Sequence, residues 1–303
     1  MFDQAEKLRR ISMGSVEPKS REQSDCRVVA VASGKGGVGK TNLVVNMSIL
    51  LAQWGNQVII LDADLGLANV DVLLRVVPEY TIEDVLNGTK TLEEVILRGP
   101  LDIKIIPGGS GLFHLANLDQ GRREQLIERL KSLEGEGNYL FIDSSAGISR
   151  NVLGFIGAAD ELIIVTTPEP TALADAYAML KVVAETGCKS QAGLVVNCVQ
   201  HLQQGERIYK RLKEVTGAYL DGMELTYLGE VYYDPVVSRA VQEGVPFVLS
   251  FPRSLAAASL TKVARRLAYR SLGSEAESRG GVGSFFTRLY QFVTNRRGRI
   301  VGS

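Results

Sequence analysis

A glycine-rich stretch at residues 33–41 constrains the fold more than any other feature of this sequence. It reads SGKGGVGKT and follows the apolar run RVVAVA at residues 27–32. The pattern matches G-x-x-x-x-G-K-[ST], a loop between a strand and a helix whose backbone N–H groups surround phosphate oxygens. We therefore predict that Lys40 contacts the β- and γ-phosphates of a nucleotide and that the Thr41 hydroxyl binds Mg²⁺. The alternative is a glycine-rich turn that only packs a helix against a sheet.

The apolar runs that follow this loop indicate the fold class. Runs rich in β-branched residues, such as VIIL at 58–61 and LIIVT at 162–166, alternate with helix-length segments. Such runs are typical of parallel strands that are buried on both faces. We predict an α/β fold in which a mostly parallel, twisted sheet carries helices on both faces.

Changes in composition along the chain predict its organisation. The first residues are polar, and a stretch rich in glycine, serine and charge interrupts the pattern near the other end. We expect a flexible segment at residues 1–25, a nucleotide-binding domain at 26–272, a linker at 273–283 and an amphipathic helix at 284–303.

Composition excludes several classes of protein. Lysine plus arginine and aspartate plus glutamate each number 34, so no field of the whole molecule attracts nucleic acid. The three cysteines, at positions 26, 188 and 198, are too dispersed for a C-x-x-C pair, and their odd number argues against a disulfide framework. No apolar run is long enough to span a bilayer, and no leader is visible. We expect a cytoplasmic protein.

Aspartates stand at the ends of two predicted strands. Asp62 and Asp64 follow VIIL, and Asp143 follows YLFI. Because open α/β sheets bind ligands at the carboxyl ends of their strands, these carboxylates are expected to face the phosphates. Asp143 is then the residue that holds Mg²⁺ through water. The alternative for Asp64 and Asp143 is a helix cap or a turn.

The loop itself carries a resemblance to a known family. KGGVGKT, with a second lysine at Lys35, resembles the deviant Walker A motif of the MinD/ParA family of ATPases. The resemblance implies a MinD-like P-loop fold, Mg²⁺-dependent ATP hydrolysis and an ATP-bound homodimer in which Lys35 reaches the other subunit's phosphates. It also implies that Asp64 orients the attacking water and that Asp62 lies near the metal. The alternative for Lys35 is an exposed lysine without a role.

Further segments resemble the nucleotide contacts of this family. The strand AGLVV ends in Asn197, where the family places an asparagine that reads adenine, although a turn asparagine is the alternative. Residues 65–71 and 144–148 resemble its two switch segments, with Ser145 where glycine is usual. Residues 228–234 resemble the segment after the sixth strand, with Tyr232 where proline is usual. The expected ATP ligands are Gly34, Lys35, Gly36, Gly37, Val38, Gly39, Lys40, Thr41, Asn197 and Asp234; the expected metal ligands are Thr41, Asp62 and Asp143; and the expected catalytic residues are Asp64, Lys35 and Lys40.

The N-terminal segment points to one branch of the family. DQAEKLR at residues 3–9 resembles the activator element of the FlhG-type regulators of flagellar number. That resemblance implies that the segment folds on the GTPase FlhF and stimulates it. The residues concerned are Asp3, Gln4, Ala5, Leu8 and Arg9. A solvated tail is the alternative.

The C-terminal residues form an amphipathic pattern. Apolar side chains recur at helical spacing, with Arg288 and several later arginines outside the stripe. The pattern predicts a helix that lies in an anionic membrane surface or packs on the ATPase domain, or does each in turn. The membrane-facing residues are Phe285, Phe286, Leu289, Phe292 and Val293.

Together these resemblances imply an ATP-switched regulator of flagellar number and placement, and the amphipathic C-terminal pattern predicts that it binds reversibly to the inner face of the cell membrane. The resemblance implies FlhF and either switch-complex (C-ring) proteins or a flagellar transcription activator as partners. A septum-placement MinD-type or a DNA-partitioning ParA-type ATPase is the alternative. Nucleic acid is not expected as a partner, because the basic stripe at Lys262, Arg265, Arg266 and Arg270 is modest.

Overall fold

An eight-stranded sheet forms the centre of the molecule. The computed structural model describes residues 26–64, 69–108, 130, 132–273 and 280–294. The strand order is β3-β4-β2-β5-β1-β6-β7-β8, and only the β3–β4 pair is antiparallel. The predicted mostly parallel sheet is therefore confirmed. The strands are β1 (Arg27–Ala32), β2 (Val58–Ala63), β3 (Leu97–Arg98), β4 (Lys104–Pro107), β5 (Tyr139–Ser144), β6 (Glu161–Thr166), β7 (Gln191–Val199) and β8 (Glu224–Tyr232).

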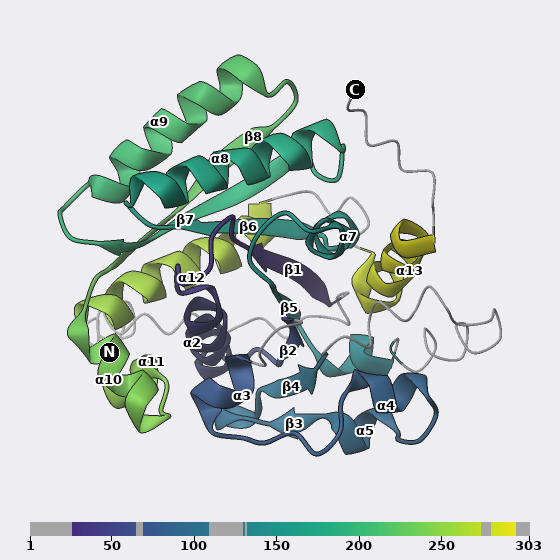
Figure 1. The fold of residues 1–303 in the computed structure, drawn as a ribbon. Helices are drawn as coiled ribbons and strands as arrows, with labels where there is room; N and C mark the ends of the chain where they lie inside the picture. Colours follow the sequence, from purple (N-terminus) through teal and green to yellow (C-terminus); the bar gives the residue numbers. More distant parts are fainter. Residues whose placement is uncertain (1–25, 65–68, 109–129, 131, 274–279, 295–303) are drawn as a thin grey trace, which may run out of the picture.

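Helices cover both faces of the sheet, each over its own apolar core (Figure 1). On one face lie α2 (Lys40–Gln53), α3 (Asn69–Leu74), α10 (Pro235–Glu243), α11 (Phe247–Ser250) and α12 (Leu255–Gly273). On the other lie α4 (Ile82–Leu86), α5 (Leu92–Val95), α7 (Arg150–Ala158), α8 (Pro170–Glu185), α9 (Gln204–Tyr219) and α13 (Gly281–Thr294). Short 3-10 turns occupy η1 (Pro100–Asp102) and η3 (Ser132–Glu136).

The central strands are buried along their whole length because both of their faces are covered. Every residue of β1, β2 and β5 is buried. Their parallel register places Asp62 of β2 opposite Asp143 of β5, and Val31 of β1 opposite the same Asp143. The sheet therefore brings the two strand-end aspartates to the start of the glycine-rich loop.

The C-terminal helix packs on the body of the molecule. Helix α13 lies beside α7, and Phe285, Phe286 and Leu289 are buried in the same core (Figure 1). Phe292 and Val293 are half-buried. The helix begins at Gly281, so residues 281–283, which the sequence pattern assigns to the linker, form its first turn. Packing on the ATPase domain, one of the two predicted uses of the apolar stripe, is what this structure shows.

Helix lengths bear on the membrane question as well. Within the described part of the chain, every helix is too short or too polar to cross a bilayer. Residues 3–9 and 65–68, to which the sequence assigns partner-activating and switch roles, lie outside the described residues.

Candidate active site

The glycine-rich loop joins β1 to α2, and its glycines have steric reasons to be glycine. Gly37 and Gly39 have φ angles of 78° and 87°, in the left-handed region that side chains disfavour. A Cβ on Gly34 would lie 2.3 Å from the backbone oxygen of Asp175 in α8. The loop therefore needs small residues both for its curl and for its close approach to α8.

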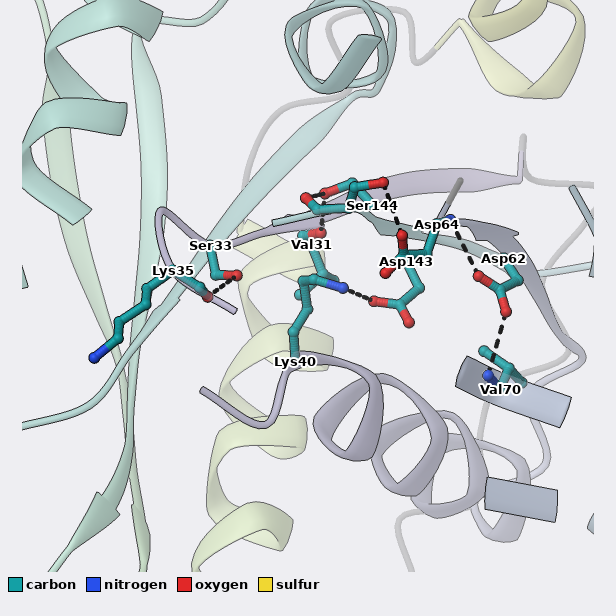
Figure 2. Close-up of polar contacts among 10 residues, drawn as sticks. Val31, Ser33, Lys35, Lys40, Asp62, Asp64, Val70, Asp143 and Ser144 are labelled. Carbon is teal, nitrogen blue, oxygen red and sulfur yellow. Dashed lines mark hydrogen bonds and ion pairs between the residues drawn. The ribbon is translucent and has the colours of Figure 1, made fainter. Parts of the chain in front are cut away.

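Lys40, at the first turn of α2, points at Asp143 (Figure 2). Its Nζ lies 2.6 Å from Oδ1 of Asp143, and the two side chains are 7% and 0% exposed. Burial raises the pKa of Asp143, and the positive charge of Lys40 acts against that rise. The pair is thus a charge-assisted hydrogen bond that keeps a buried carboxylate compensated.

The second oxygen of Asp143 indicates where a cation fits. Oδ2 is buried and has no hydrogen-bond partner among the described residues. A carboxylate oxygen in that situation is costly unless a cation or a water satisfies it. Because Asp62 lies on the neighbouring strand, in register with Asp143, the two carboxylates form an oxygen-rich donor set of the kind that Mg²⁺ prefers.

Asp62 organises the chain that leaves β2. Its Oδ1 accepts the N–H of Asp64 at 3.1 Å, and its Oδ2 accepts the N–H of Val70 at 3.2 Å. Burial, followed by the negative charge of Asp143, raises the pKa of Asp62 to about 6. A bound cation would favour the ionised form of Asp62 and lower this pKa again.

Asp64 contacts the segment that follows β5. Its Oδ1 accepts a hydrogen bond of 3.0 Å from Oγ of Ser145. The preceding residue, Ser144, donates its hydroxyl to the carbonyl of Val31 at 2.9 Å (Figure 2). The structure therefore brings Asp64, Asp143 and Lys40 to one end of the sheet, as the sequence predicts for strand-end residues.

Lys35 has different surroundings from Lys40 although both stand in the same loop. Its Nζ bonds Oε2 of Glu169 at 2.8 Å and Oγ1 of Thr171 at 3.0 Å. The side chain is 40% exposed and points away from Lys40 and Asp143 (Figure 2). Glu169 and Thr171 stand at the start of α8, a position that sequence reasoning missed. The only signal for them is the Pro-Glu-Pro-Thr run directly after β6.

Asn197 lies against the loop. Its Nδ2 donates to the carbonyl of Val38 at 2.8 Å, and the side chain is buried. A Cβ on Gly39 would lie 2.4 Å from the same Nδ2, so the loop and the end of β7 fit together only with glycine there. The asparagine predicted to read the base is thus placed next to the phosphate-binding backbone.

Asp234 has a structural task. One carboxylate oxygen accepts the N–H of Val236, at the start of α10, at 3.2 Å. The other accepts the N–H groups of Leu255 and Ala256, at the start of α12, at 3.0 and 3.4 Å. Asp234 therefore caps two helices. Its predicted contact with ATP stays a prediction.

The sequence and the fold of this chain are similar to those of known proteins. A family model described as an AAA domain matches residues 26–195. Antiactivator FleN of Pseudomonas aeruginosa is 37% identical, over 92% of this chain and 96% of FleN. Flagellum site-determining protein YlxH of Helicobacter pylori is 33% identical, over 97% of this chain and 100% of YlxH. MinD of Pyrococcus horikoshii, solved with Mg-ADP, is 27% identical with a TM-score of 0.63, over 81% of this chain and 97% of that one.

The chain belongs to the MinD/ParA family of P-loop ATPases. It is an ATP-binding and ATP-hydrolysing protein. A further solved relative, the MinC:MinD cell division complex of Aquifex aeolicus, aligns over 82% of this chain and 98% of that one, with 26% identity and a TM-score of 0.64. The ligand of the MinD structure from Pyrococcus horikoshii is Mg-ADP, a nucleotide bound with magnesium.

Proposed function

We propose that this chain is an ATP-dependent dimerising switch that regulates flagellar number and placement. The observation that carries the proposal is the similarity to FleN and YlxH over nearly the whole length of all three chains. FleN is named an antiactivator, and YlxH is named a flagellum site-determining protein. The similarity includes the segments outside the phosphate loop.

The site supports a mechanism in which ATP rearranges existing contacts. In this structure Nζ of Lys40 is paired with Asp143. When ATP binds, its phosphates replace Asp143 as the partner of Lys40. Thr41, Asp62 and Asp143 would hold Mg²⁺, which would neutralise phosphate charge. Asp64 then orients the water that attacks the γ-phosphate.

Lys35 supplies the link between subunits. It is exposed, and among the described residues the contacts of its Nζ in its own chain are with the exposed side chains of Glu169 and Thr171. Exposed ion pairs are worth about 1 kcal/mol or less, so Lys35 leaves this position at little cost. In the dimer Lys35 reaches the partner's phosphates. Hydrolysis and release of the γ-phosphate then remove the negative charge that attracts it.

The C-terminal helix gives the switch a location. Its apolar side chains are covered by the ATPase domain in this structure, and the same side chains suit a membrane interface. We propose that the ATP-bound dimer releases both helices onto an anionic membrane surface. Two helices on one particle bind more tightly than one because the second contact is intramolecular.

The partners follow from the flagellar relatives. We propose that residues 3–9 fold on FlhF and stimulate its GTPase activity. C-ring proteins or a flagellar transcription activator are the proposed downstream partners. Deletion of the gene is expected to change the number of flagella and to leave septum position normal; minicells would instead favour the septum-placement alternative.

Chromatography with light scattering tests the switch itself. The Asp64→Ala variant with ATP and Mg²⁺ is expected to persist as a dimer, because it assembles but hydrolyses ATP much more slowly than the parent. The Lys35→Ala variant is the matched control and is expected to stay monomeric under the same conditions. A monomeric Asp64→Ala protein with every nucleotide would refute the proposed switch.

A further inference from the structure

The segment after β5 is held at both ends, and Ser145 lies between the two anchors. Ser144 donates its hydroxyl to the carbonyl of Val31 in β1 at 2.9 Å. Gly147, with φ at 89°, donates its N–H to the carbonyl of Ser33, at the start of the phosphate loop, at 2.9 Å. The backbone at Ser145 is therefore fixed relative to the phosphate loop.

The carboxylate of Asp64 is approached from this fixed segment. Oγ of Ser145 donates to Oδ1 of Asp64 at 3.0 Å, and the N–H of Asp64 is held by Asp62 at 3.1 Å. Asp64 is thus restrained at its backbone by β2 and at its side chain by the segment after β5. Both restraints come from elements that also hold the phosphate loop and Asp143.

We propose that Ser145 is a positioning residue for ATP hydrolysis, whose hydroxyl holds the Asp64 carboxylate in the orientation that directs the attacking water. The inference rests on the proposed role of Asp64. A serine hydroxyl has one hydrogen to donate and keeps its lone pairs for another donor, so it can bond Asp64 without competing for the water.

The expected effect falls on turnover and leaves ATP binding unchanged. Lys40, Thr41 and the glycine-rich backbone bind the nucleotide, and Ser145→Ala leaves all of them intact. The loss of one hydrogen bond that orients a carboxylate is expected to lower kcat about three- to tenfold, with little change in the KM for ATP. Ser145→Thr keeps the hydroxyl and is expected to retain most of the turnover.

A double-mutant cycle tests whether Ser145 acts through Asp64. Single-turnover rates are measured for the parent, Ser145→Ala, Asp64→Ala and the double variant, with Ser145→Gly and Ser145→Thr alongside. If the inference is correct, Ser145→Ala slows the parent and has no further effect in the Asp64→Ala background. Equal fractional losses in both backgrounds, or a parent-like or faster Ser145→Ala enzyme, would overturn it.

A second measurement needs no nucleotide. Hydrogen exchange at the Asp64 amide is expected to become at least about twofold faster in Ser145→Ala and to return toward the parent rate in Ser145→Thr. Unchanged exchange contradicts the proposed restraint. If Asp64→Ala keeps full turnover, the proposed role of Asp64 is wrong, and the Ser145 inference fails with it. If Asp64→Ala is inactive while Ser145→Ala matches the parent, only the Ser145 inference is wrong.

Discussion

Two lysines of one loop, five residues apart, differ in what their loss would cost. Lys40 is buried against a buried carboxylate, whereas the partners of Lys35 are exposed to water. Removing one member of a buried pair leaves an uncompensated charge, but an exposed pair is screened by solvent. Nucleotide chemistry alone does not reveal this difference, since both lysines are predicted to contact phosphates.

We predict that Lys40→Ala and Lys35→Ala have separable effects. Lys40→Ala is expected to lower the free energy of unfolding by about 3 kcal/mol, because Asp143 remains buried without its cation. Lys35→Ala is expected to lower it by less than about 1 kcal/mol. Urea denaturation without nucleotide measures both. Equal losses for the two variants would mean that the buried pair contributes no more to the free energy of unfolding than the exposed pair does.

At the scale of elements, the contact between α13 and α7 connects the C-terminal helix to the nucleotide site. Helix α7 begins at Arg150, directly after the segment that contains Ser145, and its N-cap is Ser149. Arg288 of α13 bonds Asp160 at 2.9 Å, and Asp160 also accepts the N–H of Val28 in β1. The segment after β5 and α13 therefore both adjoin the same helix, α7.

We predict that Gly154→Leu releases α13. A Cβ on Gly154 would lie 3.0 Å from Cδ1 of Phe292 and 3.3 Å from Cδ1 of Leu289, so a larger side chain displaces the helix. Overpacking costs about 1–3 kcal/mol, which shifts the equilibrium between docked and released α13 by roughly 5- to 150-fold. Sedimentation with anionic vesicles is expected to show binding without ATP.

Two controls accompany that measurement. Gly157→Ala lies on the same helix, and its Cβ meets Cys188 Sγ at an ordinary 3.7 Å, so vesicle binding is expected to stay dependent on ATP. A chain ending at residue 279 lacks the helix and is expected not to bind. If Gly154→Leu folds normally and binds no better than the parent, α13 packing does not limit membrane binding.

At the scale of the whole molecule, the proposed activities lie in separate parts of the chain. ATP hydrolysis is assigned to the carboxyl ends of the central strands, membrane binding to α13, and FlhF stimulation to residues 3–9. The balanced total of 34 basic and 34 acidic residues fits contacts that are local in character. Substitutions in residues 3–9 are therefore expected to leave ATP hydrolysis and membrane binding unchanged.

Gln4→Ala tests this separation. The variant is expected to hydrolyse ATP and to bind vesicles as the parent does, while stimulation of FlhF GTPase activity falls severalfold. The measurement is phosphate release from FlhF and GTP, with and without each form of this protein. Lys7→Ala, in the same segment but not among the residues assigned to the activator element, serves as the control. Undiminished stimulation by Gln4→Ala would remove the assigned role of the segment.

The sequence by itself determined the fold class and the phosphate loop, because these depend on short contiguous patterns. A buried strand, a glycine loop and a helix follow one another between residues 27 and 53, and strand-end aspartates need only the sheet to bring them together. Only the tertiary structure decided which distant residues meet: Lys35 with Glu169, Ser145 with Asp64, and α13 with α7. An apolar stripe or an exposed charge indicates that a partner exists, but packing between segments far apart in the chain selects that partner.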